Sequence, residues 1–124
     1  MVKLSVVMPV YNEEKTIKDI VNKVKKIKIN DIVKEIIIVD DYSTDTTKHI
    51  LKNLKGNSTK VFYHKKNMGK GAAIKTGFKN STGDIIIIQD ADLEYNPDEY
   101  ERLLKPIMEN KTKVVYGSRL NAIR

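Results

Sequence analysis

Three carboxylates lie close together in the second half of the chain. Asp90, Asp92 and Glu94 fall within five residues, just after the apolar run Ile85–Ile88, which has the length of a buried strand. Unpaired carboxylates this close would repel one another and raise one another's pKa. A hard divalent cation such as Mg²⁺ or Mn²⁺ would remove that repulsion, because these ions prefer carboxylate oxygens as ligands. The alternative is a turn-forming aspartate followed by a helix-capping carboxylate, and the spacing alone leaves both open.

A second acidic pair, Asp40 and Asp41, follows the β-branched run Ile36–Val39. Either carboxylate would accept a hydrogen bond from a nucleobase N–H group or from a ribose hydroxyl. The alternative is that Asp41 or Ser43 only caps the helix that follows. The residues themselves favour neither interpretation.

The segment Asn67–Ala73 is glycine-rich and basic and leads into a helical pattern, so it is suited to receive a phosphate group. The chain has no G-x-x-x-x-G-K-S/T motif and no G-x-G-x-x-G motif after its first strand. These absences argue against a P-loop and against a dinucleotide-binding domain. The alternative for the glycines is a tight turn with close helix packing.

Four other residues of chemically useful types are predicted to lie outside the site. His49 and His64 have no metal-ligand spacing and no partner motif nearby. Tyr63 and Tyr116 are predicted to be packing residues.

Strand-like runs alternate with helical patterns along the chain, which predicts an α/β fold with a parallel sheet and right-handed crossovers. The expected order is strand Leu4–Val10, helix Glu13–Lys28, strand Ile36–Val39, helix Thr44–Lys55, strand Val61–His64, helix Lys70–Asn80, strand Ile85–Ile88, a helix from Pro97, and strand Val114–Tyr116. Ligands of such sheets bind beyond the carboxyl ends of the strands, which is where both acidic clusters fall.

Those acidic clusters stand out because the chain is otherwise basic. It has 124 residues, 23 basic against 16 acidic, and a formal net charge of +7. A lysine-rich solvated surface explains the charge as well as an anionic partner does, and no nucleic-acid motif is present, so nucleic acid is not predicted as a partner. Without cysteine there is no disulfide and no thiolate metal site. No apolar run reaches the roughly 20 residues that span a bilayer. We expect one cytoplasmic domain over residues 1–124.

Five segments, taken in this order, resemble the motifs of family 2 glycosyltransferases with the GT-A fold. The similarity runs from about Lys3 to Leu120, and the branch that it resembles most is that of dolichol-phosphate mannosyltransferases and other polyprenyl-phosphate glycosyltransferases. The resemblance implies a Rossmann-like, mostly parallel sheet with helices on both faces, forming the nucleotide-sugar-binding half of a GT-A domain. The segments are Val6–Glu14, Ile38–Asp41, Asn67–Ala73, Asp90–Glu94 and Gly117–Arg119.

The resemblance also implies roles for residues around the nucleoside. Pro9, Tyr11 and Glu13 would line the pocket for the base and ribose. Asp41 would meet the edge of the base, and Asp40 would support it.

Six further residues are implied around the diphosphate and its metal: Lys70, Asp90, Ala91, Asp92, Glu94 and Arg119. Asp90 and Asp92 would form a D-x-D element that holds Mg²⁺ or Mn²⁺, with Glu94 as a third metal ligand. Lys70 would lie near the nucleotide. Arg119 would neutralise the donor diphosphate or an acceptor phosphate, with its planar fork of N–H donors.

Two departures from the family pattern affect these expectations. The family usually reads D-D-G-S-T-D-G-T after the second strand, whereas here Tyr42 and Thr46 replace the glycines. Family domains also continue well beyond the position of Arg124, with the part that contacts the acceptor and often supplies the catalytic base. This chain is therefore expected to be either a fragment or an unusually short relative, and we assign no catalytic residue.

The implied function is inverting transfer of a sugar from a GDP- or UDP-sugar to an acceptor, with polyprenyl or dolichyl phosphate at the cytoplasmic face of a membrane as a candidate. One alternative is a nucleotide-sugar-binding module without turnover. Another is a receiver-type signalling domain, but its acidic pair would follow the first strand rather than the second. The base, the sugar, the acceptor and the oligomeric state stay open.

Overall fold

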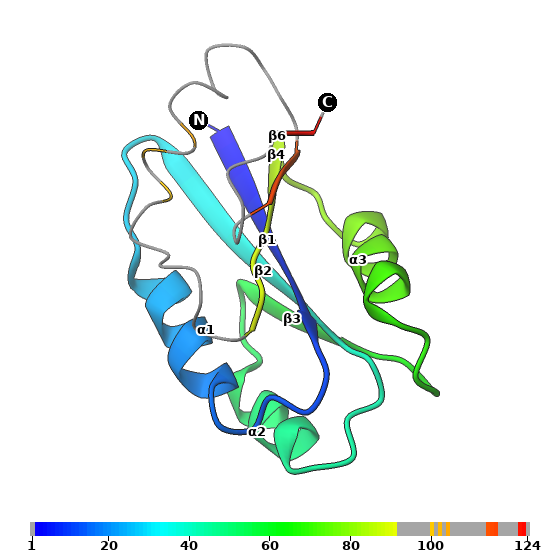
Figure 1. Cartoon of the computed structure of the whole chain (residues 1–124). Helices are drawn as coiled ribbons and strands as arrows, with labels where there is room; N and C mark the ends of the chain where they lie inside the picture. Colours follow the sequence, from blue (N-terminus) through cyan, green and yellow to red (C-terminus); the bar gives the residue numbers. More distant parts are fainter. Residues whose placement is uncertain are drawn as a thin grey trace.

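The computed structural model describes residues 2–91, 100, 102, 104, 114–116 and 122–123. Strands and helices alternate as the sequence predicts (Figure 1). The elements are β1 (Val2–Val10), α1 (Ile17–Lys26), β2 (Ile32–Asp40), α2 (Thr47–Leu54), β3 (Thr59–Tyr63), α3 (Lys70–Lys79), β4 (Ile85–Ile88), β5 (Val114–Tyr116) and β6 (Ala122–Ile123).

Within the described residues these strands form one sheet in the order β3-β2-β1-β4-β5-β6. All neighbouring pairs are parallel except β5 and β6, which are antiparallel. The sheet is therefore mostly parallel, and the carboxyl ends of β1, β2, β3 and β4 meet at one edge. The predicted α/β fold is confirmed.

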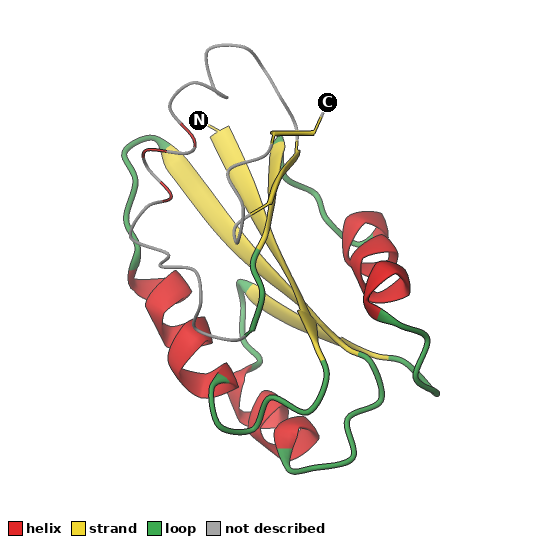
Figure 2. Cartoon of the chain, in the orientation of Figure 1, coloured by secondary structure: helices red, strands yellow, loops and turns green. Residues whose placement is uncertain are grey.

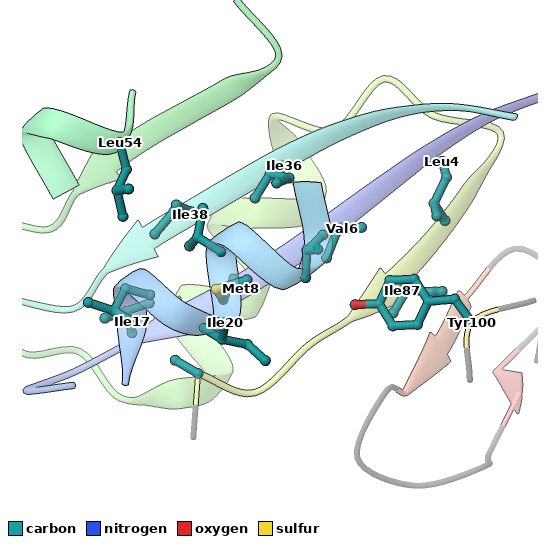
Figure 3. Close-up of a cluster of buried hydrophobic side chains, with 14 of the residues drawn as sticks. Leu4, Val6, Met8, Ile17, Ile20, Ile36, Ile38, Leu54, Ile87 and Tyr100 are labelled. Atoms are coloured by element: carbon teal, nitrogen blue, oxygen red, sulfur yellow. The ribbon is translucent and has the colours of Figure 1, made fainter. Parts of the chain in front are cut away.

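The helices cover both faces of the sheet, with α1 and α2 on one face and α3 on the other (Figure 2). Successive residues of a strand point to opposite faces, so β1 supplies both cores. Leu4, Val6 and Met8 pack with Ile17 and Ile20 of α1 in the larger core (Figure 3). On the other face, the smaller core joins β1 and β2 to α3 through these residues: Val7, Ile37, Val39 and Ala73.

A glycine lets α3 approach this second face closely. A Cβ atom on Gly77 would overlap the side chain of Val7 in β1. Close packing is therefore found at Gly77, whereas a Cβ atom on Gly71, one of the glycines of the Asn67–Ala73 segment, would meet open space.

A buried carboxylate links the strands of the sheet at the end away from their carboxyl ends. Glu35 of β2 is 4% exposed, and its Oε2 accepts hydrogen bonds from the Ser5 hydroxyl at 2.5 Å, the Thr82 backbone N–H at 2.7 Å and the Thr82 hydroxyl at 3.0 Å. The ammonium groups of Lys3 and Lys60 lie 3.6 and 3.8 Å from Oε1. This Glu35 cluster links β1, β2, β3 and the segment before β4.

Several predicted boundaries are wrong. The first two helices begin at Ile17 and Thr47, after the predicted Glu13 and Thr44, because the residues between strand and helix form loops that bind one another. The third strand ends at Tyr63, so His64 lies beyond it. Of the helix predicted from Pro97, only residues 100, 102 and 104 are described, and all three are helical. Among the described helices, none is long and apolar enough to cross a membrane.

Candidate functional site

A cavity of about 410 Å³ lies at the carboxyl edge of the sheet. It is lined by the end of β1 and the loop after it, by residues after β2 and β4, and by the segment that leads into α3, although these are four separate stretches of sequence. Predicted site residues among them are Pro9, Tyr11, Glu13, Asp41, Lys70, Asp90 and Ala91. The other lining residues had no individual role predicted, although three of them belong to the segment predicted to receive phosphate: Val10, and from that segment Asn67, Gly69 and Ala73.

The loop after β1 is fastened to the loop after β2 by Asn12. Its side-chain oxygen accepts the backbone N–H groups of Thr44 at 2.7 Å and Asp45 at 3.3 Å. Its own backbone N–H donates to the Ser43 hydroxyl at 2.9 Å. Asn12 has a φ of 51°, in the left-handed region that asparagine tolerates better than most residues. The loop that carries Tyr11 is thus fixed to the loop that follows Asp41, and both of these residues line the cavity.

Asp40 supports this turn from inside the protein. It is fully buried, and its carboxylate accepts the Ser43 hydroxyl at 2.5 Å and the Ser43 backbone N–H at 3.1 Å. It does not line the cavity. The alternative that Asp41 or Ser43 caps α2 is wrong, because Thr46 is the N-cap and Asp45 accepts the Thr47 backbone N–H at 2.9 Å.

Asp41 binds the glycine-rich loop. Its two oxygens accept the backbone N–H groups of Met68 and Gly69, each at 2.8 Å, and Oδ1 also lies 2.8 Å from Nδ1 of His64. Burial raises the pKa of Asp41, but the hydrogen bonds from His64, Met68 and Gly69 outweigh it and hold the pKa below its ordinary value. Asp41 is therefore an anion at neutral pH, and three of its roughly four acceptor positions are used by these bonds.

Lys70 and Asp90 meet across the cavity. The ammonium nitrogen of Lys70, the first residue of α3, lies 2.6 Å from Oδ1 of Asp90, which follows β4. The Asp90 side chain is 16% exposed and faces the cavity, so its chemistry fits a hard divalent ion. Asp92, Glu94 and Arg119 lie outside the described residues. Within the described part of the chain, no group of three or more His, Cys, Asp or Glu side chains is placed to hold a metal.

Thr16 ties the loop after β4 to the start of α1. Its hydroxyl donates to the carbonyl oxygen of Ala91 at 2.7 Å and lies 3.3 Å from Oε2 of Glu13. The backbone N–H of Glu13 donates to the Thr47 hydroxyl at 3.0 Å. Thr16 occupies the N-cap position of α1, but its hydroxyl makes no capping bond. The sequence offered no signal that it would reach another loop.

The prediction for the tyrosines and histidines needs correction at two positions. Tyr63 was predicted to be a packing residue, but it is 40% exposed. His64 does not line the cavity, but it contacts Asp41, which does. The available signal was its place at the carboxyl end of the predicted third strand, at the same edge of the sheet as the acidic pairs.

Comparisons with known proteins agree with this geometry. Residues 5–123 match the family described as Glycosyl transferase family 2. The chain is 37% identical over 106 residues to the undecaprenyl-phosphate 4-deoxy-4-formamido-L-arabinose transferase of Proteus mirabilis, covering 82% of this chain and 32% of that protein. It is 31% identical over 118 residues to the dolichol-phosphate mannosyltransferase of Pyrococcus furiosus, covering 94% and 33%. The chain thus spans about a third of the length of these two relatives.

Two solved structures show the same fold. One is S. aureus TarS in complex with UDP-GlcNAc, with a TM-score of 0.69 and 27% identity over 86% of this chain and 31% of that one. The other is glucosyl-3-phosphoglycerate synthase from Mycobacterium tuberculosis in complex with Mn²⁺, UDP and glucosyl-3-phosphoglycerate. Its TM-score is 0.69 and its identity 26%, over 86% of this chain and 39% of that one. The receiver-type alternative is therefore wrong, and the fold is the GT-A fold. The chain belongs to glycosyltransferase family 2.

Proposed function

We propose that the cavity binds a nucleoside-diphosphate sugar and that residues 1–124 form the donor-binding part of a glycosyltransferase. The observation that carries the proposal is the convergence of residues from four separate segments on one cavity at the carboxyl edge of the sheet. Its volume of about 410 Å³ falls within the range of pockets that hold small molecules.

The base and ribose would bind at the side of the cavity formed by the loops after β1 and β2. Tyr11 is 45% exposed beside the cavity, and an exposed aromatic ring offers a surface against which a base can stack. Asp41 would accept one hydrogen bond from the base, because three of its acceptor positions are already used. Asp40 would support the turn after β2 through its two hydrogen bonds from Ser43, without contacting the nucleotide.

The diphosphate would bind at the other side, near Lys70 and the start of α3. Gly69 is the N-cap of α3 and offers no side chain to the first backbone N–H groups of the helix, which attract anions. Lys70 would contact a phosphate oxygen from there, and Arg119 would add a second positive charge. Asp90, with Asp92 and Glu94, would hold Mg²⁺ or Mn²⁺, which supplies positive charge to the departing diphosphate when bound.

The acceptor we propose is a polyprenyl phosphate, because the two curated relatives are named as transferases acting on undecaprenyl phosphate and dolichol phosphate. An acceptor phosphate oxygen would attack the anomeric carbon as the bond from that carbon to the diphosphate oxygen breaks, with inversion. This acceptor is already an anion and needs no general base, so no catalytic base is assigned. We propose the cytoplasmic face of a membrane as the place of this reaction.

Calorimetry tests the donor site. We expect UDP or GDP, and one of their sugars, to bind in the presence of Mn²⁺ and to bind more weakly in EDTA. Lys70→Met should weaken binding about tenfold or more, because a charge-assisted contact is lost. Lys75→Met is the matched control, since Lys75 is an exposed residue of the same helix. Absence of binding by every nucleotide tried, or an equal effect of both substitutions, would contradict the proposed site.

A further inference from the structure

His64 lies just beyond β3 and is held at both ring nitrogens. Nδ1 lies 2.8 Å from Oδ1 of Asp41, and Nε2 lies 2.8 Å from the Thr76 hydroxyl oxygen in α3. The backbone N–H of His64 donates to the carbonyl oxygen of Asp40 at 2.9 Å. The side chain is 9% exposed. The ring therefore connects the ends of β2 and β3 with the middle of α3.

The partners of the ring determine which nitrogen carries a proton toward Asp41. The pKa of Asp41 is held below its ordinary value, so its carboxylate only accepts hydrogen bonds. Nδ1 of His64 must therefore be the donor. The Thr76 hydroxyl can donate to Nε2 or accept from it, so this bond forms in either case.

The bond from His64 orients the Asp41 carboxylate, and this carboxylate in turn binds the loop that forms one wall of the cavity. Its oxygens accept the backbone N–H groups of Met68 and Gly69 at 2.8 Å. Gly69 has a φ of 94°, a conformation that side-chain-bearing residues rarely adopt and that glycine adopts without strain, so the fixed contacts of this turn are the bonds to Asp41. The next residue is Lys70, whose ammonium group reaches Asp90.

We infer that His64 is a positioning residue for donor binding, acting through Asp41 on residues 67–70. The bond from Nδ1 fixes the Asp41 carboxylate in the orientation that binds two successive backbone N–H groups. The backbone of Lys70 and the start of α3 are then in place before the diphosphate arrives, so binding does not have to order the loop. This role rests on the proposed donor site, although the link from His64 to the loop can be measured without a nucleotide.

Two substitutions separate the two ring contacts. In His64→Asn the amide N–H group lies near the position of Nδ1 and can still donate to Asp41. In His64→Gln the longer side chain places its amide near the position of Nε2, so the contact with Thr76 is kept and the contact with Asp41 is lost. Thr76→Val is the matched control, because it removes the partner of Nε2 and leaves the bond to Asp41 intact.

The first measurement is amide hydrogen exchange by NMR on the nucleotide-free chain. We expect the Met68 and Gly69 amides to exchange at least tenfold faster in His64→Gln, and at near wild-type rates in His64→Asn and Thr76→Val. The second is the affinity for UDP or GDP with Mn²⁺, where His64→Gln should bind about tenfold more weakly and the other two like wild type. Thermal unfolding of each variant records its stability.

A merely structural histidine would give a different pattern. Exchange and affinity would then follow thermal stability, and the two His64 variants would behave alike, which would overturn the inference. If the wild type binds no nucleotide, the proposed function and the donor-binding role both fail. Equal exchange at Met68 and Gly69 in all variants would show that His64 does not order the loop, whatever the nucleotide affinity.

Discussion

Replacing Glu35 by Gln tests how much one buried charge contributes to this sheet. Oε2 of Glu35 accepts three hydrogen bonds, two from Thr82 and one from Ser5. A hydrogen bond to a charged group contributes roughly 1.5–3 kcal/mol and a neutral one roughly 0.5–1.5 kcal/mol, so each bond should lose about 1 kcal/mol. The Gln amide nitrogen would also face the ammonium groups of two lysines. We expect the free energy of unfolding at neutral pH to fall by about 3 kcal/mol.

The loss should depend on pH with a definite sign. Burial raises the pKa of Glu35, but the hydrogen bonds from Ser5 and Thr82 and the charge of Lys3 outweigh it and hold the pKa below its ordinary value. A carboxyl group whose pKa is lowered by folding stabilises the protein above its unfolded pKa, about 4.3 for glutamate. That stabilisation disappears as the pH falls through the folded pKa. The difference between wild type and Glu35→Gln should therefore be constant from pH 7 to about pH 5.5 and shrink at more acidic pH.

Urea unfolding followed by circular dichroism measures both effects. The midpoint should shift at pH 7 with an unchanged dependence on urea concentration. Glu14→Gln is the control, because Glu14 is exposed and its substitution should change stability by less than about 0.5 kcal/mol. Nucleotide affinity should be the same in both variants, since neither residue lines the cavity. A Glu35→Gln protein as stable as wild type at pH 7, or a difference that grows on acidification, would refute the reasoning.

Two further substitutions test the packing of α3 and the site. Gly77→Ala should destabilise the protein by about 1–3 kcal/mol in thermal unfolding, because the new methyl group overlaps the side chain of Val7. Adding Val7→Ala should restore part of that loss. A Gly77→Ala protein as stable as wild type would contradict the close approach of α3 to β1. Asp41→Asn should change the preference between GDP and UDP in calorimetry more than Asp40→Asn does, because Asp41 lines the cavity and Asp40 does not. An equal loss of affinity for both nucleotides from either change would indicate a role in folding alone.

The fold was predictable because its strands are short β-branched runs between amphipathic helices. The pattern could not indicate which face each strand residue occupies, because both faces of β1 are buried and Val6 and Val7 look alike in sequence. Helix starts were predicted too early because polar loop residues such as Asn12 and Thr44 bind each other rather than the helix. Such contacts depend on the spatial order of the strands.

Part of the cavity lining could be predicted from motifs in the sequence. Pro9, Tyr11 and Asp41 each belong to a recognisable segment, and all three line the cavity. His64 was missed because its partners are 23 residues before it and 12 residues after it, and no local spacing marks them. The pairing of Lys70 with Asp90 has the same character: two motifs were recognised, but only the fold shows that their side chains meet.

The central position of β1 has a consequence for synthesis of the chain. β1 is bordered by β2 on one side and β4 on the other, and Lys3 bonds to Asp84, 81 residues further on. A ribosome adds roughly 5–20 residues per second, so about 4–16 s pass between the synthesis of β1 and that of β4. Until β4 has been made, one edge of β1 has no partner strand. During that interval an apolar strand shows unpaired backbone groups, the kind of edge that joins strands of other chains. The nascent protein therefore passes through a period of aggregation risk that the finished sheet does not share.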